Sequence, residues 1–132
     1  MTKDEYIYIE KLLKKYRQNK AEVELITVMG YDYSSVKVQT SSISTLDNTV
    51  IRIGKLKREI AIVDALISIL SAKDKFIIES FYKEGRKLMW IGSHPNVMID
   101  TENGVGMAKK EAIKRMAYIY NKNVKYFEHI KD

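Results

Sequence analysis

The chain has 132 residues, 45% of them hydrophobic, which is typical of one compact domain or of one domain with an appended arm. It contains no cysteine, which excludes disulfide bonds and thiolate metal sites, and its single proline and six glycines favour long helices over a β fold with many turns. The formal net charge of +6 is compatible with nucleic acid, an anionic membrane surface or an acidic protein as the partner.

The positive charge is concentrated toward the C-terminal end. Residues 1–82 hold 13 Lys and Arg against 11 Asp and Glu, whereas residues 83–132 hold 10 against 6. Either a functional basic surface or a solubilising excess of charge accounts for this difference. No run approaches the roughly 20 apolar residues that span a bilayer, and no signal-type segment opens the chain, so we expect a cytoplasmic protein with no membrane partner.

Residues 1–30 have the pattern of an N-terminal helical arm. Thr2 and Glu5 predict a capping box, and Ile9 and Leu13 belong to an apolar stripe at helical spacing that ends near Gln18. Residues 21–29 continue or restart the helix, and Gly30 is its predicted stop. Residues 31–45 predict a linker or loop, since seven of the twelve residues from 34 to 45 are Ser or Thr; a short extended piece around Val36 and Val38 is an alternative within it.

The strongest helical pattern covers residues 46–70. Its apolar residues step by three and four, and they are Val50, Ile53, Leu56, Ile60, Val63, Ile67 and Leu70. This spacing fits a helix that faces the core of a monomer, and it also fits a short coiled-coil seam in a homodimer. Gly54 weakens the helix slightly.

The residues that follow predict two short helical segments and a final helix. Ser71 caps the first, which ends at Gly85, and residues 88–91 form a short apolar segment. The Asn103-Gly104 dipeptide lies between apolar residues and predicts a small β-hairpin insert as an alternative to a loop in residues 92–106. The final helix is expected to start near Met107. The side chains expected to hold these helices together are Phe76, Phe81, Trp90, Ala112 and Met116.

The C-terminal part of the chain resembles the RinA and ArpU families, phage-type transcriptional activators whose helix-turn-helix is similar to region 4 of bacterial sigma factors. The residues that carry the resemblance are the stretch 70–85 with its aromatic-Tyr pair and Gly85, then Trp90-Ile91-Gly92, and then Gly104-Val105-Gly106 followed by Lys109, Lys110, Ala112 and Arg115. The resemblance covers about the last 85 residues. It implies an all-α fold with an N-terminal helix, a long central helix and a helix-turn-helix-like DNA-binding domain in residues 46–132.

The same resemblance implies a phage or prophage transcription regulator that binds double-stranded DNA and contacts RNA polymerase. The chain departs from the pattern in one place. There are 15 residues between Ile91 and Met107, where a standard helix-turn-helix uses a turn of three or four. This departure puts the contacts of the second helix most in doubt.

The basic residues of the last helix form the predicted DNA-binding site. With Ala112 and Met116 facing inward, the open side carries cations that neutralise phosphates or pair with guanine. The predicted DNA-binding residues are Lys109, Lys110, Lys114, Arg115 and Lys87. A plain solvated helix face has the same pattern, and Glu111 favours that alternative.

No set of residues in the sequence suggests catalysis. There is no recognisable Ser-His-acid arrangement, and Asn103-Gly104-Val105-Gly106 lacks the Lys-Ser/Thr of a phosphate loop. His94 and His129 are far apart in the sequence, so we predict no metal and no cofactor. We therefore expect a protein that is not an enzyme. The alternative to DNA binding is a helical protein-protein interaction or dimerisation module in which residues 6–16 and 46–70 grip the partner.

Overall fold

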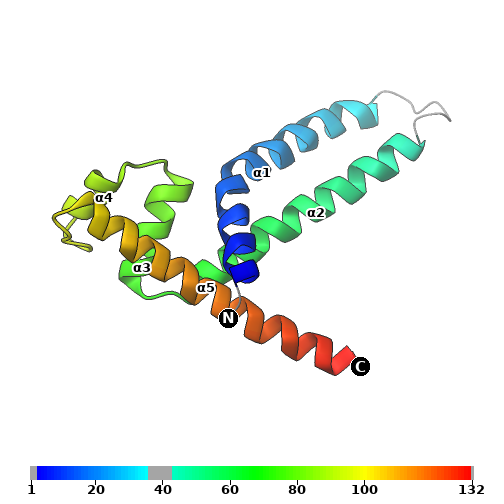
Figure 1. The fold of residues 1–132 in the computed structure, drawn as a ribbon. Coiled ribbons are helices and arrows are strands. Elements are labelled where there is room, and N and C mark those ends of the chain that lie inside the picture. Colours follow the sequence, from blue (N-terminus) through cyan, green and yellow to red (C-terminus); the bar gives the residue numbers. More distant parts are fainter. Residues whose placement is uncertain (1–2, 36–42, 132) are drawn as a thin grey trace.

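The computed structural model describes residues 3–35 and 43–131, and almost all of them are helical (Figure 1). The elements are α1 (Lys3–Ser35), α2 (Ile43–Ser68), α3 (Ala72–Ile78), the π-helix η2 (Glu79–Lys83), α4 (Leu88–Ser93) and α5 (Glu102–Lys131). The predicted all-α class is confirmed, and the described residues contain no strand. The β-hairpin considered for residues 92–106 is not formed, because Asn103 and Gly104 belong to the first turn of α5.

The first helix is longer than its sequence pattern predicted. It passes Gln18 and Gly30 without a break and ends at Ser35. A glycine inside a helix costs only about 1 kcal/mol relative to alanine. The partly buried Val23 and Ile26 extend the inner face against α2, so packing offsets this cost. The predicted extended piece at residues 36 and 38 lies outside the described residues.

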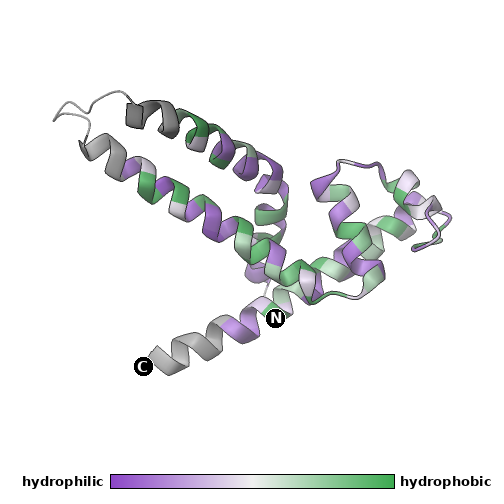
Figure 2. Cartoon of the chain, turned by 180° about the vertical axis from the view of Figure 1, so that it is seen from behind, coloured by the Kyte–Doolittle hydropathy of each residue, from purple (hydrophilic) through white to green (hydrophobic). Residues whose placement is uncertain are grey.

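Helices α1 and α2 lie side by side and antiparallel, and together they form a helical hairpin that projects from the rest of the molecule (Figure 1). Hydrophobic and hydrophilic residues alternate along both helices (Figure 2). On one side of the hairpin Asn19 donates a hydrogen bond to Glu59 at 3.0 Å, and Arg52 forms an ion pair with Glu22 at 3.2 Å. These polar contacts tie the two helices together on that side.

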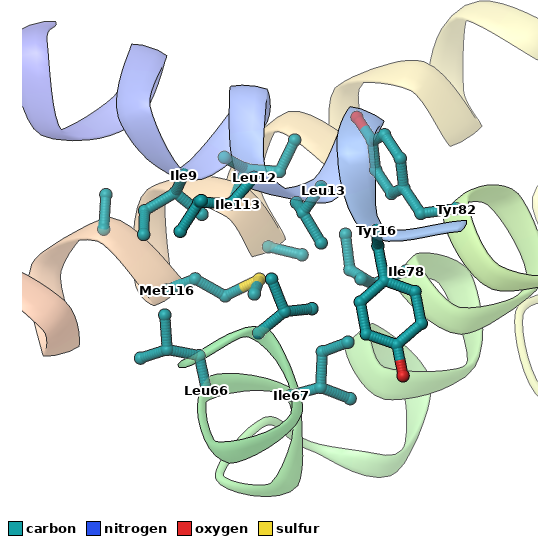
Figure 3. Packing of buried hydrophobic residues seen from close by; sticks show 13 residues of the cluster. Ile9, Leu12, Leu13, Tyr16, Leu66, Ile67, Ile78, Tyr82, Ile113 and Met116 are labelled. Carbon is teal, nitrogen blue, oxygen red and sulfur yellow. The ribbon is translucent and has the colours of Figure 1, made fainter. Parts of the chain in front are cut away.

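The main hydrophobic core sits at the base of the hairpin, where α1, α2, η2 and α5 meet (Figure 3). Its buried members include Ile9, Leu12, Leu13, Tyr16, Val63, Leu66, Ile67, Ile78, Tyr82, Ile113 and Met116. The apolar stripe predicted in residues 46–70 is divided between two environments. Leu56, Val63 and Ile67 are buried within the chain, whereas Val50 near the start of α2 is 66% exposed.

A polar contact fastens the hairpin to the C-terminal helices beside this core. The Asp64 carboxylate accepts hydrogen bonds from the Tyr16 hydroxyl at 2.8 Å and from Lys83 Nζ at 2.9 Å. Partial burial of Asp64 disfavours its charged form, but the hydrogen bonds from Lys83 and Tyr16 outweigh burial and lower its pKa. The contact joins α1, α2 and η2, three elements that are distant in the sequence.

Candidate nucleic-acid interface

Helices α3, α4 and the first turns of α5 form a three-helix unit with its own small core. Ile77, Ile91, Val97 and Val105 are its buried members. Helix α3 starts as predicted, since the Ser71 hydroxyl accepts a hydrogen bond from the backbone amide of Asp74. The unit therefore holds α4 and the start of α5 in a fixed relation, which a helix-turn-helix needs in order to place its second helix in a DNA groove.

The connection between α4 and α5 is a compact turn of residues 94–101. The amide of Ile99 donates to the carbonyl of Gly92 at 3.0 Å, and a side chain at Gly92 would place its Cβ only 2.4 Å from the Ile99 carbonyl oxygen. Glycine is thus required at this position for the chain to fold back. Because α5 begins at Glu102, the connection is much shorter than the interval from Ile91 to Met107, although it still exceeds a standard turn.

Helix α5 starts five residues before the predicted position, at Glu102 rather than near Met107. The Thr101 hydroxyl accepts a hydrogen bond from the amide of Gly104 at 3.0 Å, as a helix-capping residue does. This early start moves Lys109 and Lys110 from the first turns of the helix to its third turn. The sequence holds a signal for it, because a threonine followed by an acidic first turn is a typical helix start.

The two lysines of the third turn differ in their surroundings. Lys109 is half-buried, with its Nζ 4.0 Å from the centre of the Phe81 ring and 5.5 Å from that of Tyr82. Burial is the largest cause that lowers the pKa of Lys109. Lys110 is exposed to solvent. Lys109 therefore packs as a cation over an aromatic ring, and Lys110 is the cation of this pair that is open to a ligand.

The other two predicted cations of α5 both have acidic partners. Lys114 forms an ion pair with Glu111 at 3.2 Å, and both side chains are about half exposed. Arg115 Nη1 hydrogen-bonds to the carboxylate of Asp74 in α3, whose side chain is only 10% exposed. An exposed pair such as that of Lys114 breaks at little cost, whereas Arg115 fastens α5 to α3. Arg115 is thus less available to DNA than its sequence position suggested.

The start of α4 carries the fifth predicted residue and one that the sequence did not single out. Lys87 precedes the helix and is exposed. Beside it, the Arg86 guanidinium lies 4.4 Å from the centre of the Trp90 ring. Trp90 was expected in the core, but it is 41% exposed and stacks on Phe76 at 6.3 Å. An exposed indole beside a guanidinium is a surface that suits the sugar-phosphate edge of a nucleic acid.

The exposed side of α5 presents a single row of side chains over its first four turns. The row consists of Asn103, Met107, Lys110 and Lys114, which step by four, three and four residues and therefore share one face. All four are exposed, and the row lies opposite the buried Val105, Ala112 and Met116. An asparagine amide can pair with adenine and a lysine with guanine or phosphate. We call this row the α5 outer row.

Comparisons with protein-family models, with curated proteins and with solved structures gave no significant match to this chain. In residues 3–35 and 43–131, no helix is long and apolar enough to cross a membrane. The same residues hold no group of three or more His, Cys, Asp or Glu side chains arranged to bind a metal ion. The geometry of the three-helix unit therefore carries the functional argument.

Proposed function

We propose that this chain binds double-stranded DNA through the α5 outer row and acts as a sequence-specific transcription regulator of the phage type. The observation that carries the proposal is the row itself, with Asn103 and Met107 in the first turns and Lys110 and Lys114 behind them. In a helix-turn-helix the first turns of the second helix enter the major groove. In this arrangement Asn103 reads a base edge, while Lys110 and Lys114 contact phosphate or guanine.

The cations at the start of α4 extend the proposed interface. Lys87 and Arg86 are exposed in the chain segment that leads into α4, and they supply phosphate contacts beside the groove. Glu102 and Glu111 on α5 oppose binding, which limits the purely electrostatic affinity and leaves more of the discrimination to Asn103. Contact with RNA polymerase, which the family resemblance implies, is part of the same proposal.

The test is a fluorescence-anisotropy titration of the protein with a labelled random-sequence duplex at low and high salt. Each phosphate contact changes the affinity by about 3.5-fold between 50 and 200 mM salt, so steep salt dependence is expected. Lys110→Glu with Lys114→Glu should abolish binding and leave the helical content unchanged, because both side chains are exposed. Lys122→Glu is the matched control on α5, about 18 Å along the helix from Lys110.

Two results would contradict the proposal. The first is an absence of binding even at low salt, which would favour the interaction module without DNA binding. The second is a Lys110→Glu, Lys114→Glu variant that binds as well as the parent. Base readout is tested separately by selecting sites from a random library. Asn103→Ala should lose the preference for adenine at one position while it keeps its nonspecific affinity.

A further inference from the structure

The two flat sides of the α1–α2 hairpin differ in chemistry. On one side Asn19, Glu22, Arg52 and Glu59 form hydrogen bonds and an ion pair across the two helices. On the other side a groove of about 300 Å³ runs between α1 and α2, and its lining includes Val23, Glu24, Lys57, Ile60 and Ala61. One side is thus a polar surface whose groups are satisfied within the chain, and the other is largely apolar.

The apolar side continues from this groove toward the tip of the hairpin, and we call it the valine face. It consists of Val23, Glu24 and Val28 from α1 and of Val50, Gly54, Lys57 and Ala61 from α2. On α2 its members step by four, three and four residues and so lie in one row. Val28 is 62% exposed and Val50 is 66% exposed. In Figure 2 both hairpin helices carry hydrophobic residues on the part that projects from the molecule.

Gly54 is a second sign that something approaches this face closely. It lies in the interior of α2, where glycine is less favourable than alanine. A Cβ at Gly54 would have no atom within 4 Å, so no contact among the described residues requires glycine there. Small residues at Gly54 and Ala61, on successive turns of one row, would let another helix pack near the backbone of α2.

We propose that the valine face binds the valine face of a second copy of this chain, so that two hairpins form a four-helix bundle. The charges on the face are self-complementary. Glu24 lies on the α1 side of the groove and Lys57 on its α2 side, at the same level along the hairpin, since both line that groove. Both are exposed, and neither forms an ion pair within the described part of the chain.

A twofold axis parallel to the hairpin places α1 of one copy over α2 of the other. Glu24 of each copy then meets Lys57 of its partner, twice by symmetry. The opposite arrangement, with the axis across the hairpin, would place α1 on α1 and bring Glu24 toward its own copy. Charge therefore selects the parallel arrangement, in which both three-helix units lie at the same end of the bundle. This inference does not depend on DNA binding.

The size of the face sets the expected strength of association. Residues 50–64 of α2 span about 22 Å, and two helices are roughly 20 Å wide, so each copy buries on the order of 450 Å². Such an area lies at the lower end for specific interfaces and corresponds to micromolar affinity. Monomer and dimer should therefore exchange with protein concentration.

The experiment is sedimentation velocity of the full chain without DNA, over protein concentrations from about 1 to about 100 µM, a range that brackets a micromolar dissociation constant. The parent should shift from monomer to dimer. Val50→Glu should stay monomeric throughout. Ile51→Glu is the matched control, because Ile51 is 69% exposed on the same helix but points away from the face. It should dimerise like the parent, and both variants should keep the helical content of the parent.

A charge exchange tests the arrangement of the two copies. Glu24→Lys and Lys57→Glu should each weaken association by about fivefold or more, since each reverses two symmetric pairs. The double variant should restore association to near the parent level. A parent that stays monomeric to the highest concentration would overturn the proposal. Equal effects of Val50→Glu and Ile51→Glu, or a double variant weaker than both single variants, would overturn it as well.

Discussion

The ion pair between Arg115 and Asp74 separates a structural role from a DNA-binding role. Arg115 was predicted to bind DNA, but its guanidinium is held by a carboxylate that is only 10% exposed. A hydrogen bond to a charged group contributes about 1.5–3 kcal/mol when buried and about 0–1 kcal/mol at the surface. Since the Arg115 side chain is 55% exposed, we expect Arg115→Gln to lower the free energy of unfolding by about 1–2 kcal/mol.

Asp74→Asn should destabilise the protein by a similar amount, because it also removes a negative charge from the first turn of α3, worth about 0.3–1 kcal/mol. The measurement is urea unfolding followed by far-ultraviolet circular dichroism for both single variants and the double variant. The double variant should be more stable than additivity predicts by about 1 kcal/mol. In the DNA titration, Arg115→Gln and Asp74→Asn should bind alike. Additive stabilities, together with loss of binding in Arg115→Gln alone, would refute the structural role.

Three further predictions concern the packing and the polar contact described above. Met116→Ala should lower the free energy of unfolding by about 2–4 kcal/mol, because the side chain is fully buried; a loss below about 1 kcal/mol in urea unfolding would contradict this. Gly92→Ala should destabilise by about 1–3 kcal/mol, because its Cβ would collide with a backbone oxygen, whereas Gly106→Ala, whose nearest atom is 3.9 Å away, should stabilise by about 0.5–1 kcal/mol; equal effects would show that the turn is loose. The lowered pKa of Asp64 means that its stabilisation is present above the ordinary value of 3.8 and is lost as pH falls through the folded-state value, so Asp64→Asn should cost about 0.5–1 kcal/mol near neutral pH and almost nothing near about pH 3; a cost that does not depend on pH would contradict it.

Local patterns predicted the elements of this fold better than their ends. The apolar stripes of residues 6–16 and 46–70 gave the two long helices because helical periodicity is a property of the sequence alone. The end of the first helix and the start of the last were both missed. Packing against α2 carries α1 through Gly30, and the Thr101 cap starts α5 inside a dipeptide that is typical of a turn. In both cases a contact outside the local pattern decides the outcome.

The candidate site was predicted in part for the same reason. Lys110 and Lys114 lie on the exposed side of α5, as the helical period of the buried Ala112 and Met116 requires. The surroundings of Arg115 depend on Asp74, which lies 41 residues earlier in the chain, and no spacing rule reveals such a partner. Asn103 was missed because the predicted helix began after it. The DNA-binding role of all these residues stays a prediction.

The two proposed surfaces lie on different parts of the molecule and constrain each other. The valine face belongs to the projecting part of the hairpin, whereas the α5 outer row belongs to the three-helix unit at the other end (Figure 1). The core around Ile9, Ile67 and Met116 joins the two parts, and Asp64 fastens them with a polar contact. A twofold axis parallel to the hairpin would carry both α5 outer rows to one side of the dimer. Two such rows related by a twofold axis match a DNA site that is itself an inverted repeat, because the symmetry of the protein is then the symmetry of the two half-sites. Weak dimerisation suits this arrangement, since two modest DNA contacts on one duplex add their binding energies and supply the affinity that each lacks.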